Sequence, residues 1–342
     1  MARAMMNDKP IAFFGEVMLR LSPPGRELLF QTPALQIHVG GAEANVATGL
    51  ACLGHATRMI TAVSDNPMGR AVIDELRRHG VDASTIVRED GRLGLYFLQP
   101  GAGLRASEVV YDRAHSVFAD RPAKAWDWTK ALDGCGRLHL SGITPALGPN
   151  SAAAAITAAK AARDQGLGVS FDGNYRARLW ETWDSDPRGV LTQLVDHADI
   201  LFGNHRDISL LLGKTFSGDG SDRRREAAEA AFDAFPNLQL IASTARHVDD
   251  ADSHRIAARV DMRDSAHQTE EALVAGIVDR LGAGDAFATG VLHGLIEGGD
   301  AKAAAEAGLA LTCLKHSLPG DASLFTRGDL AAFEGGGLDV RR

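Results

Sequence analysis

The chain alternates short apolar runs with longer segments whose apolar residues recur at helical spacing. The continuous runs predict buried strands, and these are expected at residues 11–14, 58–63, 137–141, 167–171, 199–202, 238–242 and 273–278, with 256–260 at the sheet edge. The helical pattern predicts helices at residues 42–53, 66–80, 150–165, 187–197, 206–212, 222–234, 284–297 and 301–315. Such alternation is typical of an α/β fold with a central, mostly parallel sheet flanked by helices.

Two other segments alternate apolar and polar residues with period two, which is typical of strands with one exposed face. Leu19 and Leu21 alternate with polar residues in the first segment, and Leu95 and Phe97 do so in the second. We expect the two segments, about 17–40 and 92–114, to pair as a small antiparallel β lid outside the main sheet. Residues 1–342 would then form a single domain that carries this lid.

Composition and charge narrow the class of protein. With 342 residues, 45% of them hydrophobic, the chain can bury a sizeable core. Its 36 basic and 44 acidic residues give a net charge of −8, which argues against a general nucleic-acid binder. No apolar stretch approaches the roughly 20 residues of a membrane span.

Cysteine and histidine usage indicates an intracellular protein and argues against a zinc enzyme. Cys52, Cys135 and Cys313 lie far apart in apolar surroundings, as expected for reduced, buried thiols. The polar first ten residues do not resemble a secretory signal, so a cytoplasmic location is expected. The twelve histidines show no His-x-x-x-His pair and the cysteines no Cys-x-x-Cys pair, which makes a zinc enzyme unexpected.

Residues 279–287, Asp-Arg-Leu-Gly-Ala-Gly-Asp-Ala-Phe, join a predicted strand to a predicted helix. Glycines let a backbone turn sharply and approach a ligand closely. The first N–H groups of a helix lack internal partners and favour negative charge, so this stretch predicts an anion site. Asp285 lies among those N–H groups. It could cap the helix or act as a general base beside a phosphate, and the segment alone leaves both interpretations open.

Polar or small residues follow nearly every predicted strand. They are Glu16, Ser64-Asp65, Ser141-Gly142, Asp172-Gly173-Asn174, Gly203-Asn204, Ser243-Thr244 and Gly282–Asp285. Ligands of open parallel sheets bind at the carboxyl ends of the strands, so we expect these residues to surround a polar ligand. Strand ends meet polar loops in any protein, which explains each residue singly but the whole set less well.

Three further groups each allow a functional and a structural interpretation. Arg176 could clamp a phosphate with its planar guanidinium or simply lie on the surface. Tyr111 and Arg113, one pleat apart, could hold the carboxylate and hydroxyls of a small substrate or occupy an exposed edge strand. Asn204 and Asp207 could hold metal-bound water near phosphates or form a plain helix cap.

Two segments together resemble the signatures of one family. Residues 40–47, Gly-Gly-Ala-Glu-Ala-Asn-Val-Ala, are similar to the N-terminal signature of the ribokinase-like sugar kinases, the PfkB family, and 279–287 to their C-terminal signature. Order, spacing and the α/β alternation agree over nearly the whole chain. Arg280 stands where the family usually has Thr or Ser, and Ser64 where a glycine is usual.

Within the family, four features resemble the 2-keto-3-deoxygluconate kinases. They are Glu43 in a Gly-Ala-Glu-Ala-Asn segment, the pair Tyr111-x-Arg113, the run 171–176 followed by Leu179-Trp180, and the tail at 314–321. The resemblance implies transfer of the ATP γ-phosphoryl group, with Mg²⁺, to the 6-hydroxyl of 2-keto-3-deoxygluconate, giving 2-keto-3-deoxy-6-phosphogluconate. It leaves the need for a monovalent cation open.

The resemblance also implies roles for individual residues. Asp285 would be the catalytic base, and Gly282, Ala283 and Gly284 would offer N–H groups to the transferring phosphoryl group. The sugar site would be lined by Gly41, Ala42, Glu43, Ala44, Asn45, Tyr96, Tyr111, Arg113, Arg176 and Asp321. The nucleotide would meet Asn174, Arg176, Asn204, Ser243, Thr244, Gly282 and Gly284, with Ser243 and Thr244 in a loop after strand 238–242. Asp207 would reach metal-bound water, although the family usually has the longer Glu there.

Other functions remain as alternatives at this stage. A kinase of the same family could act on fructose, ribose, a nucleoside or tagatose 6-phosphate. A catalytically silent sugar- or nucleotide-binding protein could share the fold. A nicotinamide dehydrogenase is disfavoured because no Gly-x-Gly-x-x-Gly follows the first strand. The resemblance further implies a homodimer or higher homo-oligomer, in which a partner covers the exposed face of the lid.

Overall fold

Short apolar strands build a nine-stranded sheet at the centre of the computed structural model, which describes residues 6 and 9–336. The strand order is β14-β13-β12-β11-β10-β9-β1-β4, and β15 also pairs with β13. The strands are β1 (Ile11–Phe14), β4 (Thr57–Ile60), β9 (Arg137–Ser141), β10 (Gly168–Asp172), β11 (Ile200–Phe202), β12 (Leu240–Asp250), β13 (Ser253–Met262), β14 (Ala266–Gln268) and β15 (Ala272–Ala275). All pairings from β4 to β12 are parallel, and those of β13 are antiparallel. The predicted mostly parallel sheet is confirmed.

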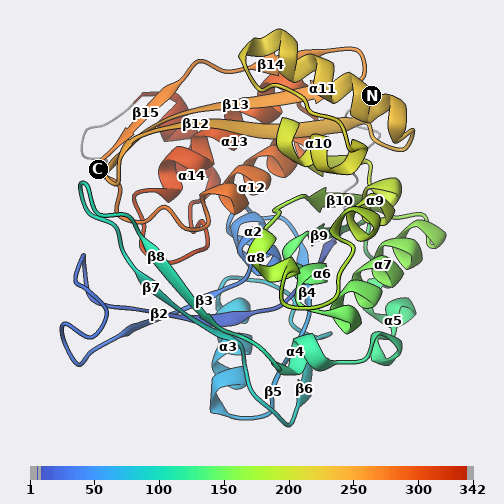
Figure 1. Ribbon diagram of the computed structural model, residues 1–342. Helices are drawn as coiled ribbons and strands as arrows, with labels where there is room; N and C mark the ends of the chain where they lie inside the picture. The colour runs from blue at the N-terminus through green and yellow to red at the C-terminus, as the bar shows by residue number, and fades with distance from the viewer. Residues whose placement is uncertain (1–5, 7–8, 337–342) are drawn as a thin grey trace.

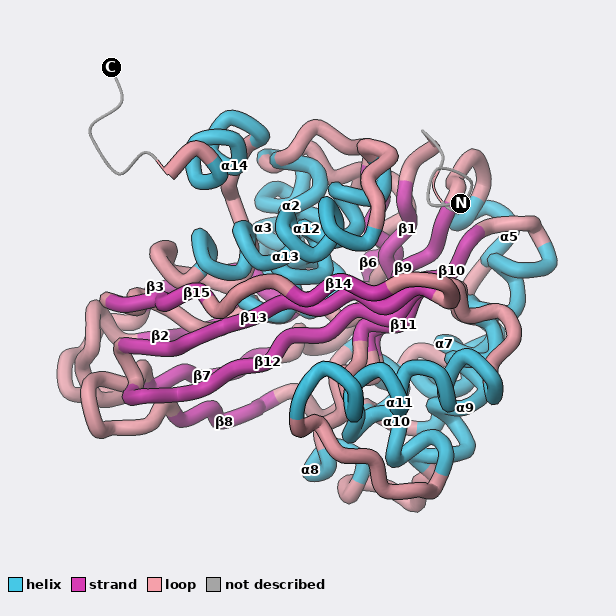
Figure 2. Tube along the Cα trace, turned by 90° about the horizontal axis from the view of Figure 1, so that it is seen from above, coloured by secondary structure: helices cyan, strands magenta, loops and turns pink. Residues whose placement is uncertain are grey.

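Helices cover both faces of this sheet (Figures 1 and 2). One face carries α2 (Ala42–Cys52), α3 (Pro67–Arg78), α12 (Ala283–Ile296) and α13 (Ala301–Lys315), with α14 (Arg327–Glu334) beyond them. The other carries α7 (Pro149–Asp164), α9 (Pro187–His197), α10 (His205–Leu212) and α11 (Gly220–Ala234). Phe13 lies in the core on the α2 and α12 side and Phe14 in the core on the α7 side. A strand buried on both faces in this way needs a continuous apolar run.

Shorter elements connect these layers. They are α4 (Val117–Asp120), a 3₁₀ turn at Ala123–Ala125, α5 (Trp128–Leu132), α6 (Ile143–Ala146), α8 (Ala177–Trp180), and the strand pair β5 (Ala62–Ser64) and β6 (Val87–Glu89). Residues 58–63 therefore divide between two strands in different sheets, β4 and β5. The short helix α8 and the helix α14 were not predicted, because four residues are too few to show a helical period and α14 follows a polar loop.

The two segments predicted to form the lid supply all four strands of a second sheet, which extends from the main body in Figure 1. Its strands are β2 (Met18–Ser22), β3 (Gln36–Gly40), β7 (Leu95–Gln99) and β8 (Glu108–Asp112), in the order β3-β2-β7-β8. Two of the three pairings are antiparallel as expected, but β2 and β7 run parallel. The difference arises because β7 returns to this sheet through α2, α3 and several strands rather than through a hairpin.

Each face of the second sheet has its own row of paired residues. His38, Arg20, Tyr96 and Tyr111 are successive partners across the four strands. Ile37, Leu21, Phe97 and Val110 form the neighbouring row. Since successive residues of a strand point to opposite faces, one face is polar and aromatic and the other is apolar. The polar row includes Tyr96 and Tyr111, which line the main cavity.

Two predictions for the last strands of the main sheet were wrong. The strand expected at 238–242 continues as β12 to Asp250, so Ser243 and Thr244 lie on a strand and not in a loop. The strand expected at the sheet edge, 256–260, is part of β13, which lies between β12 and the pair β14 and β15. Beyond Ala242 the strand is only partly buried and carries small and charged residues, so its apolar signal ends there.

Some sequence-based expectations fall partly on residues that the structure does not describe. Residues 1–5 and 7–8 contain most of the polar start of the chain, and 337–342 end the predicted 1–342 domain; both lie outside the described residues. Within residues 6 and 9–336, no helix combines the length and the apolar character needed to cross a membrane.

Candidate active site

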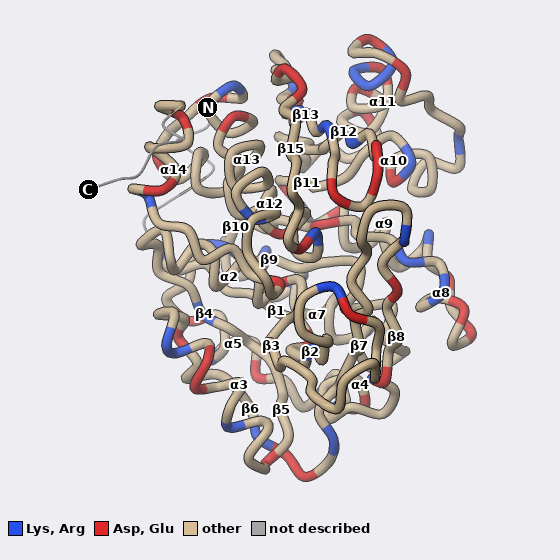
Figure 3. Tube along the Cα trace, turned by 90° about the vertical axis from the view of Figure 1, so that its left-hand side faces the viewer, with Lys and Arg blue, Asp and Glu red and all other residues tan. Residues whose placement is uncertain are grey.

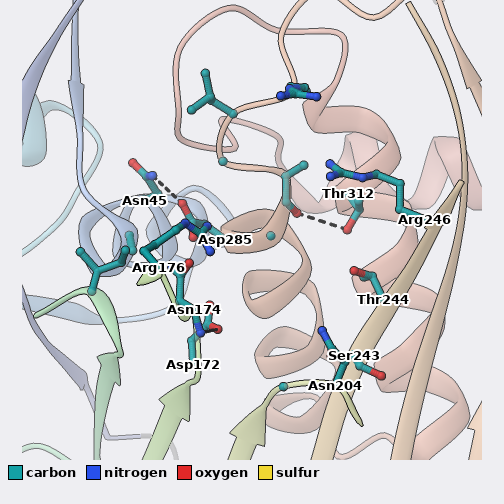
Figure 4. Close-up of a pocket in the computed structure, with 18 of the residues that line it drawn as sticks. Asn45, Asp172, Asn174, Arg176, Asn204, Ser243, Thr244, Arg246, Asp285 and Thr312 are labelled. Carbon is teal, nitrogen blue, oxygen red and sulfur yellow. Dashed lines mark hydrogen bonds between the residues drawn. The ribbon is translucent and has the colours of Figure 1, made fainter. Parts of the chain in front are cut away.

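A cavity of about 760 Å³ opens where β10 and β11 end and α2 and α12 begin (Figure 4). It lies at the carboxyl ends of parallel strands, where the sequence predicted a ligand. Lid residues form one wall and the strand β12 forms another. The predicted site residues that line it are Gly41, Ala42, Glu43, Asn45, Tyr96, Tyr111, Arg113, Asn174, Arg176, Asn204, Ser243, Thr244, Gly282, Ala283, Gly284, Asp285 and Asp321.

Asp285 lies in the first turn of α12, with its side chain turned toward Asn45. The Asn45 amide Nδ2 donates a hydrogen bond of 2.6 Å to Asp285 Oδ2. The pKa of Asp285 is raised from 3.8 to about 7, chiefly by burial and also by the charges of Asp321 and Glu43, while the hydrogen bond from Asn45 and the charge of Arg176 lower it in part. A carboxyl group with a pKa near neutrality suits a general base at physiological pH. No capping bond from the Asp285 side chain to its own helix is present among the described contacts.

The turn that starts α12 leaves no room for a side chain. Gly282 has φ of +75°, in the left-handed region. A Cβ atom at Gly282 would lie 1.7 Å from the carbonyl oxygen of Asp321. At Gly284, in contrast, a Cβ atom would meet nothing within 4 Å, because this residue faces the open cavity. The two glycines therefore serve different purposes: one permits the turn and the other keeps the helix N-terminus accessible.

Glu43 organises the floor of the cavity. Its Oε1 atom accepts hydrogen bonds from Ser141 N at 2.9 Å, Ser141 Oγ at 2.8 Å and Thr144 Oγ1 at 2.8 Å. The residue is 1% exposed, and burial raises its pKa. These contacts join the start of α2 to the end of β9. Glu43 thus borders the cavity, and its Oε1 atom is occupied by three hydrogen bonds from the protein itself.

Arg20 ties the lid to the loops around α12, a role that the sequence did not reveal. Its guanidinium pairs with Asp279 at 2.5 Å and with Asp321 at 2.6 Å, and it is 3% exposed. Tyr96 donates its hydroxyl hydrogen bond to the other oxygen of Asp321. Asp279 in turn accepts from the backbone of Leu281. A charged residue inside an apolar strand gives no periodic signal, and its partners lie more than 250 residues away.

Arg113 comes from the end of β8 and reaches the base of the lid. Its Nε and Nη2 atoms donate to Glu16 Oε2 at 2.8 and 2.5 Å. Ser116 Oγ donates to the other oxygen of Glu16. Among the described contacts, Nη1 of Arg113 has no protein partner, and the residue lines the cavity. Glu16 fixes the guanidinium and offsets part of its charge, which weakens the argument for an acidic substrate from Arg113 alone.

Three arginines gather at the wall formed by α8, β12 and the loop before α12. Arg176 points toward Asp285, and Arg246 lies beside Thr244 on β12 (Figure 4). Partial burial and the nearby Arg280 and Arg176 lower the pKa of Arg246. Three guanidinium groups on one cavity wall form an attractive site for a polyphosphate. Arg280 was noted in the sequence only as a departure from the family pattern, and neither Arg246 nor Arg280 was placed in the site.

Two acidic side chains lie near Arg176: Asp172 at the end of β10 and Asp207 in the first turn of α10. The pKa of Asp172 is raised to about 8, chiefly by burial and also by the charges of Asp285 and Asp207. Asp207 Oδ2 accepts from Asn204 N at 2.8 Å, and Asn204 Oδ1 accepts from Arg206 N at 2.8 Å, so both residues cap α10. The helix-cap interpretation is therefore confirmed, while Asp207 does not line the cavity and its metal-water role stays a prediction.

Ala44 differs from its neighbours in the predicted sugar site. Its side chain is 2% exposed and packs in the core between β1 and α12, and it does not line the main cavity. A helix that starts at the cavity wall turns every third or fourth residue away from it, which places Ala44 behind Glu43 and Asn45.

Comparisons with known proteins fit this geometry. Residues 8–324 match the model of the pfkB family carbohydrate kinases. A 2-dehydro-3-deoxygalactonokinase of Haloferax volcanii is 32% identical over 314 residues, 92% of each chain. A 2-dehydro-3-deoxygluconokinase of Bacillus subtilis is 29% identical and covers 94% of each chain. The crystal structure of a 2-dehydro-3-deoxygluconokinase of Thermotoga maritima superposes with a TM-score of 0.90 at 37% identity, over 96% of this chain and 99% of that one.

Proposed function

The chain belongs to the PfkB family of carbohydrate kinases, as the two signatures predicted, and on this premise we propose that it phosphorylates a 2-keto-3-deoxy sugar acid with ATP. The observation that supports this most is Asp285, held by Asn45 at the open N-terminus of α12 inside the cavity. A carboxylate beside a helix N-terminus combines a proton acceptor with an anion site. A silent binding protein would not need a carboxyl group whose pKa is raised to about 7.

The proposed reaction is an in-line transfer to the primary hydroxyl at C6. Asp285 accepts the hydroxyl proton while the sugar oxygen attacks the γ-phosphorus, and the bond to the bridging oxygen breaks to release ADP. N–H groups of residues 282–284 stabilise charge on the transferred group. The wall of Arg176, Arg246 and Arg280 binds the polyphosphate. Such transfers depend mostly on positioning and electrostatics, so a preformed cavity supplies most of the rate.

The site residues suit Mg²⁺ as the accompanying cation. Hard divalent cations prefer carboxylate and water oxygens, and Asp172 and Asp207 are buried carboxyl groups whose pKa values burial raises. A nearby cation would relieve that unfavourable burial. We assign Asp172, with Asp207 through water, to hold Mg²⁺, which would supply charge neutralisation for the phosphates.

The substrate proposal is 2-keto-3-deoxygluconate, giving its 6-phosphate. The Bacillus and Thermotoga relatives, both named 2-dehydro-3-deoxygluconokinase, support it. The Haloferax relative is named for the galacto epimer, which differs only at C4, so this epimer is the second candidate. Arg113, whose Nη1 atom has no partner among the described contacts, and Tyr111 line the cavity and are assigned to receive the carboxylate and a hydroxyl. No contact among the described residues of the cavity favours fructose or ribose over the acids.

We also propose that two copies pair through their lids and that the kinase works in the cytoplasm. The row Ile37, Leu21, Phe97 and Val110 gives the lid an apolar face, with Ile37 63% and Val110 48% exposed. An apolar row of this kind is covered most simply by a second copy. Cys52, Cys135 and Cys313 are free thiols, as a reducing compartment requires.

A substrate panel tests the proposal. ADP formation is measured with MgATP and 2-keto-3-deoxygluconate, 2-keto-3-deoxygalactonate, fructose, ribose and adenosine, beside a blank without acceptor. We expect kcat/KM for one or both keto-deoxy acids to exceed that for each neutral acceptor by at least about 100-fold, the contribution of one charged contact at its upper range. Selective turnover of a neutral acceptor would keep the family and refute the substrate. Absence of turnover with every acceptor would support a silent binding protein.

A further inference from the structure

Three side chains that commonly bind metals lie together at the end of α12 opposite Asp285. His55 follows α2, His293 lies in the last turn of α12, and Glu297 caps that helix. One ligand atom from each residue lies within 4.8 Å of the other two. His55 Nε2 is 2.8 Å from His293 Nδ1 and 4.0 Å from Glu297 Oε1.

The local fold explains why these residues meet. His293 and Glu297 are four residues apart, so they share one face of the helix end. α2 and α12 pack closely, since a Cβ atom at Gly49 would lie 2.9 Å from the Thr289 side chain. The backbone N–H of His55 donates to Leu50 O at 3.0 Å, which fixes the turn after α2 beside the last turn of α12.

We propose that His55, His293 and Glu297 bind a divalent transition metal such as Zn²⁺. Two imidazole nitrogens and a carboxylate oxygen are a ligand set that this class of metal accepts, and a water molecule would complete four ligands. The nitrogen–nitrogen distance of 2.8 Å is shorter, and the nitrogen–oxygen distance of 4.0 Å longer, than the roughly 3.3 Å between ligands of a tetrahedral zinc. Side-chain adjustments that lengthen the first distance and shorten the second would produce that geometry.

The proton balance of binding is simple. In the pair of neutral imidazoles, one of the two facing nitrogens carries the hydrogen. Metal binding needs a lone pair on both, so that hydrogen moves to the outer nitrogen of the same ring and no proton is released. Arg327 Nη2 lies 2.8 Å from Oε1 of Glu297 and pairs with its carboxylate. The other oxygen, Oε2, has no partner in the described contacts and can turn to the metal.

The position of the proposed metal site in the fold indicates a structural role for the metal. It lies at the C-terminal ends of two helices, where the helix dipoles favour a cation. The 14 residues of α12 place it roughly 20 Å from the start of that helix, too far for the metal to touch the substrate. The N-terminal ends of α2 and α12 carry Asn45 and Asp285, which are joined by a hydrogen bond. A metal at the opposite ends would therefore clamp the helix pair that holds the catalytic base.

A binding experiment with the metal alone tests this proposal. The full chain, free of any affinity tag, is titrated with Co²⁺ in excess Mg²⁺, which keeps the cavity carboxylates occupied. We expect one Co²⁺ per chain with the strong visible absorption of four-coordinate cobalt, and a higher thermal midpoint when Zn²⁺ is added. His55→Gln, His293→Gln and Glu297→Gln should each weaken binding by at least about 100-fold, beyond the loss caused by removing a supporting partner of a ligand.

A matched control variant distinguishes metal binding at this site from nonspecific binding to other histidines. His115 is an exposed histidine 3.3 Å from the carboxylate of Asp120, and it lacks a third ligand among the described residues. Asparagine suits its φ of +57°, so His115→Asn should bind Co²⁺ like the parent chain. Glu297→Gln decides the test if a histidine variant fails to fold, since Glu297 is half-exposed. The proposal is overturned if the parent chain does not bind Co²⁺, or if all the variants bind Co²⁺ as tightly as the parent chain does.

Discussion

At the scale of single residues, Asp285 combines a function with a cost in stability. Its folded pKa of about 7 lies above its value of 3.8 in an exposed chain. The native state therefore binds this proton more tightly than the unfolded state. The contribution of this bound proton to the stability of the native state is fully present below about pH 4 and is lost as the pH rises to about 7. The carboxylate needed for catalysis is thus the form that the fold tolerates least.

We expect Asp285→Asn to be more stable than the parent chain at pH 8. The side chain is only partly buried, so the gain should be about 1 kcal/mol, less than the full linkage energy. This corresponds to a rise of about 2–4 °C in the thermal midpoint. Asparagine can still accept the bond from Asn45, which makes the change conservative. A midpoint difference that is as large at pH 4 as at pH 8 would contradict the assigned pKa.

Arg113 is the residue on which recognition of an acid depends most. We expect Arg113→Gln to raise KM for 2-keto-3-deoxygluconate by about 10–100-fold, the range of one charged hydrogen bond. KM for ATP should stay unchanged and kcat should change little, because the contact is made equally before and during transfer. Steady-state kinetics with both substrates varied provides the check. An unchanged KM for the acid would show that Glu16 occupies the guanidinium completely.

At the scale of elements, the start of α12 depends on two glycines with different requirements. Gly282→Ala would place a methyl group against the Asp321 carbonyl, and we expect a loss of about 2–4 kcal/mol in stability. Gly284→Ala meets no obstacle and should stabilise the helix by about 0.5–1 kcal/mol. Its methyl group would enter the anion site and lower kcat/KM at least about tenfold.

Thermal unfolding and kinetics of the two variants separate these effects. A stable, weakly active Gly284→Ala enzyme beside an unstable Gly282→Ala enzyme is the expected pattern. Equal destabilisation by both substitutions would mean that the helix start is positioned otherwise than the structure shows.

The sequence predicts most reliably the elements whose buried apolar residues recur at a regular spacing. Strand 137–141 and helix 187–197 have the predicted bounds because their apolar residues pack in the core on the α7 side of the sheet. The continuation of β12 beyond Ala242 was not predicted, because a strand that lines a cavity carries polar residues on its solvent-exposed face. The same reason hid Arg246 from the predicted site.

Residues in the known signatures could be located, but their partners could not. The pairing of Asn45 with Asp285 joins two signatures 240 positions apart, and only the fold brings them together. Arg20 and Glu16 belong to no signature and act by holding Asp321 and Arg113. Buried charges of this kind are determined by tertiary contacts rather than by local pattern.

At the scale of the whole molecule, the lid presents its polar row to the cavity and its apolar row outward. We expect the parent chain to have the mass of a dimer in solution and Val110→Glu to have that of a monomer. A charge at the centre of an apolar interface leaves an unpaired, desolvated group. Light scattering coupled to size exclusion measures both masses. Phe333→Glu, an equally drastic change on α14 outside the lid, is the matched control and should leave the mass unchanged.

A monomeric parent chain would refute the proposed lid pairing without touching the kinase assignment. If Phe333→Glu also dissociated the dimer, the contact would lie elsewhere on the surface.

We propose that Asp285 removes the C6 hydroxyl proton of a sugar acid during phosphoryl transfer from ATP. The most direct measurement compares ADP formation by the parent chain and Asp285→Asn with MgATP and 2-keto-3-deoxygluconate, at equal occupancy of both substrates. We expect a 6-phosphate product and a turnover reduced by at least about 100-fold in the variant, the lower range for general base catalysis. Near-normal turnover by a folded Asp285→Asn enzyme would contradict the role of Asp285 as the base.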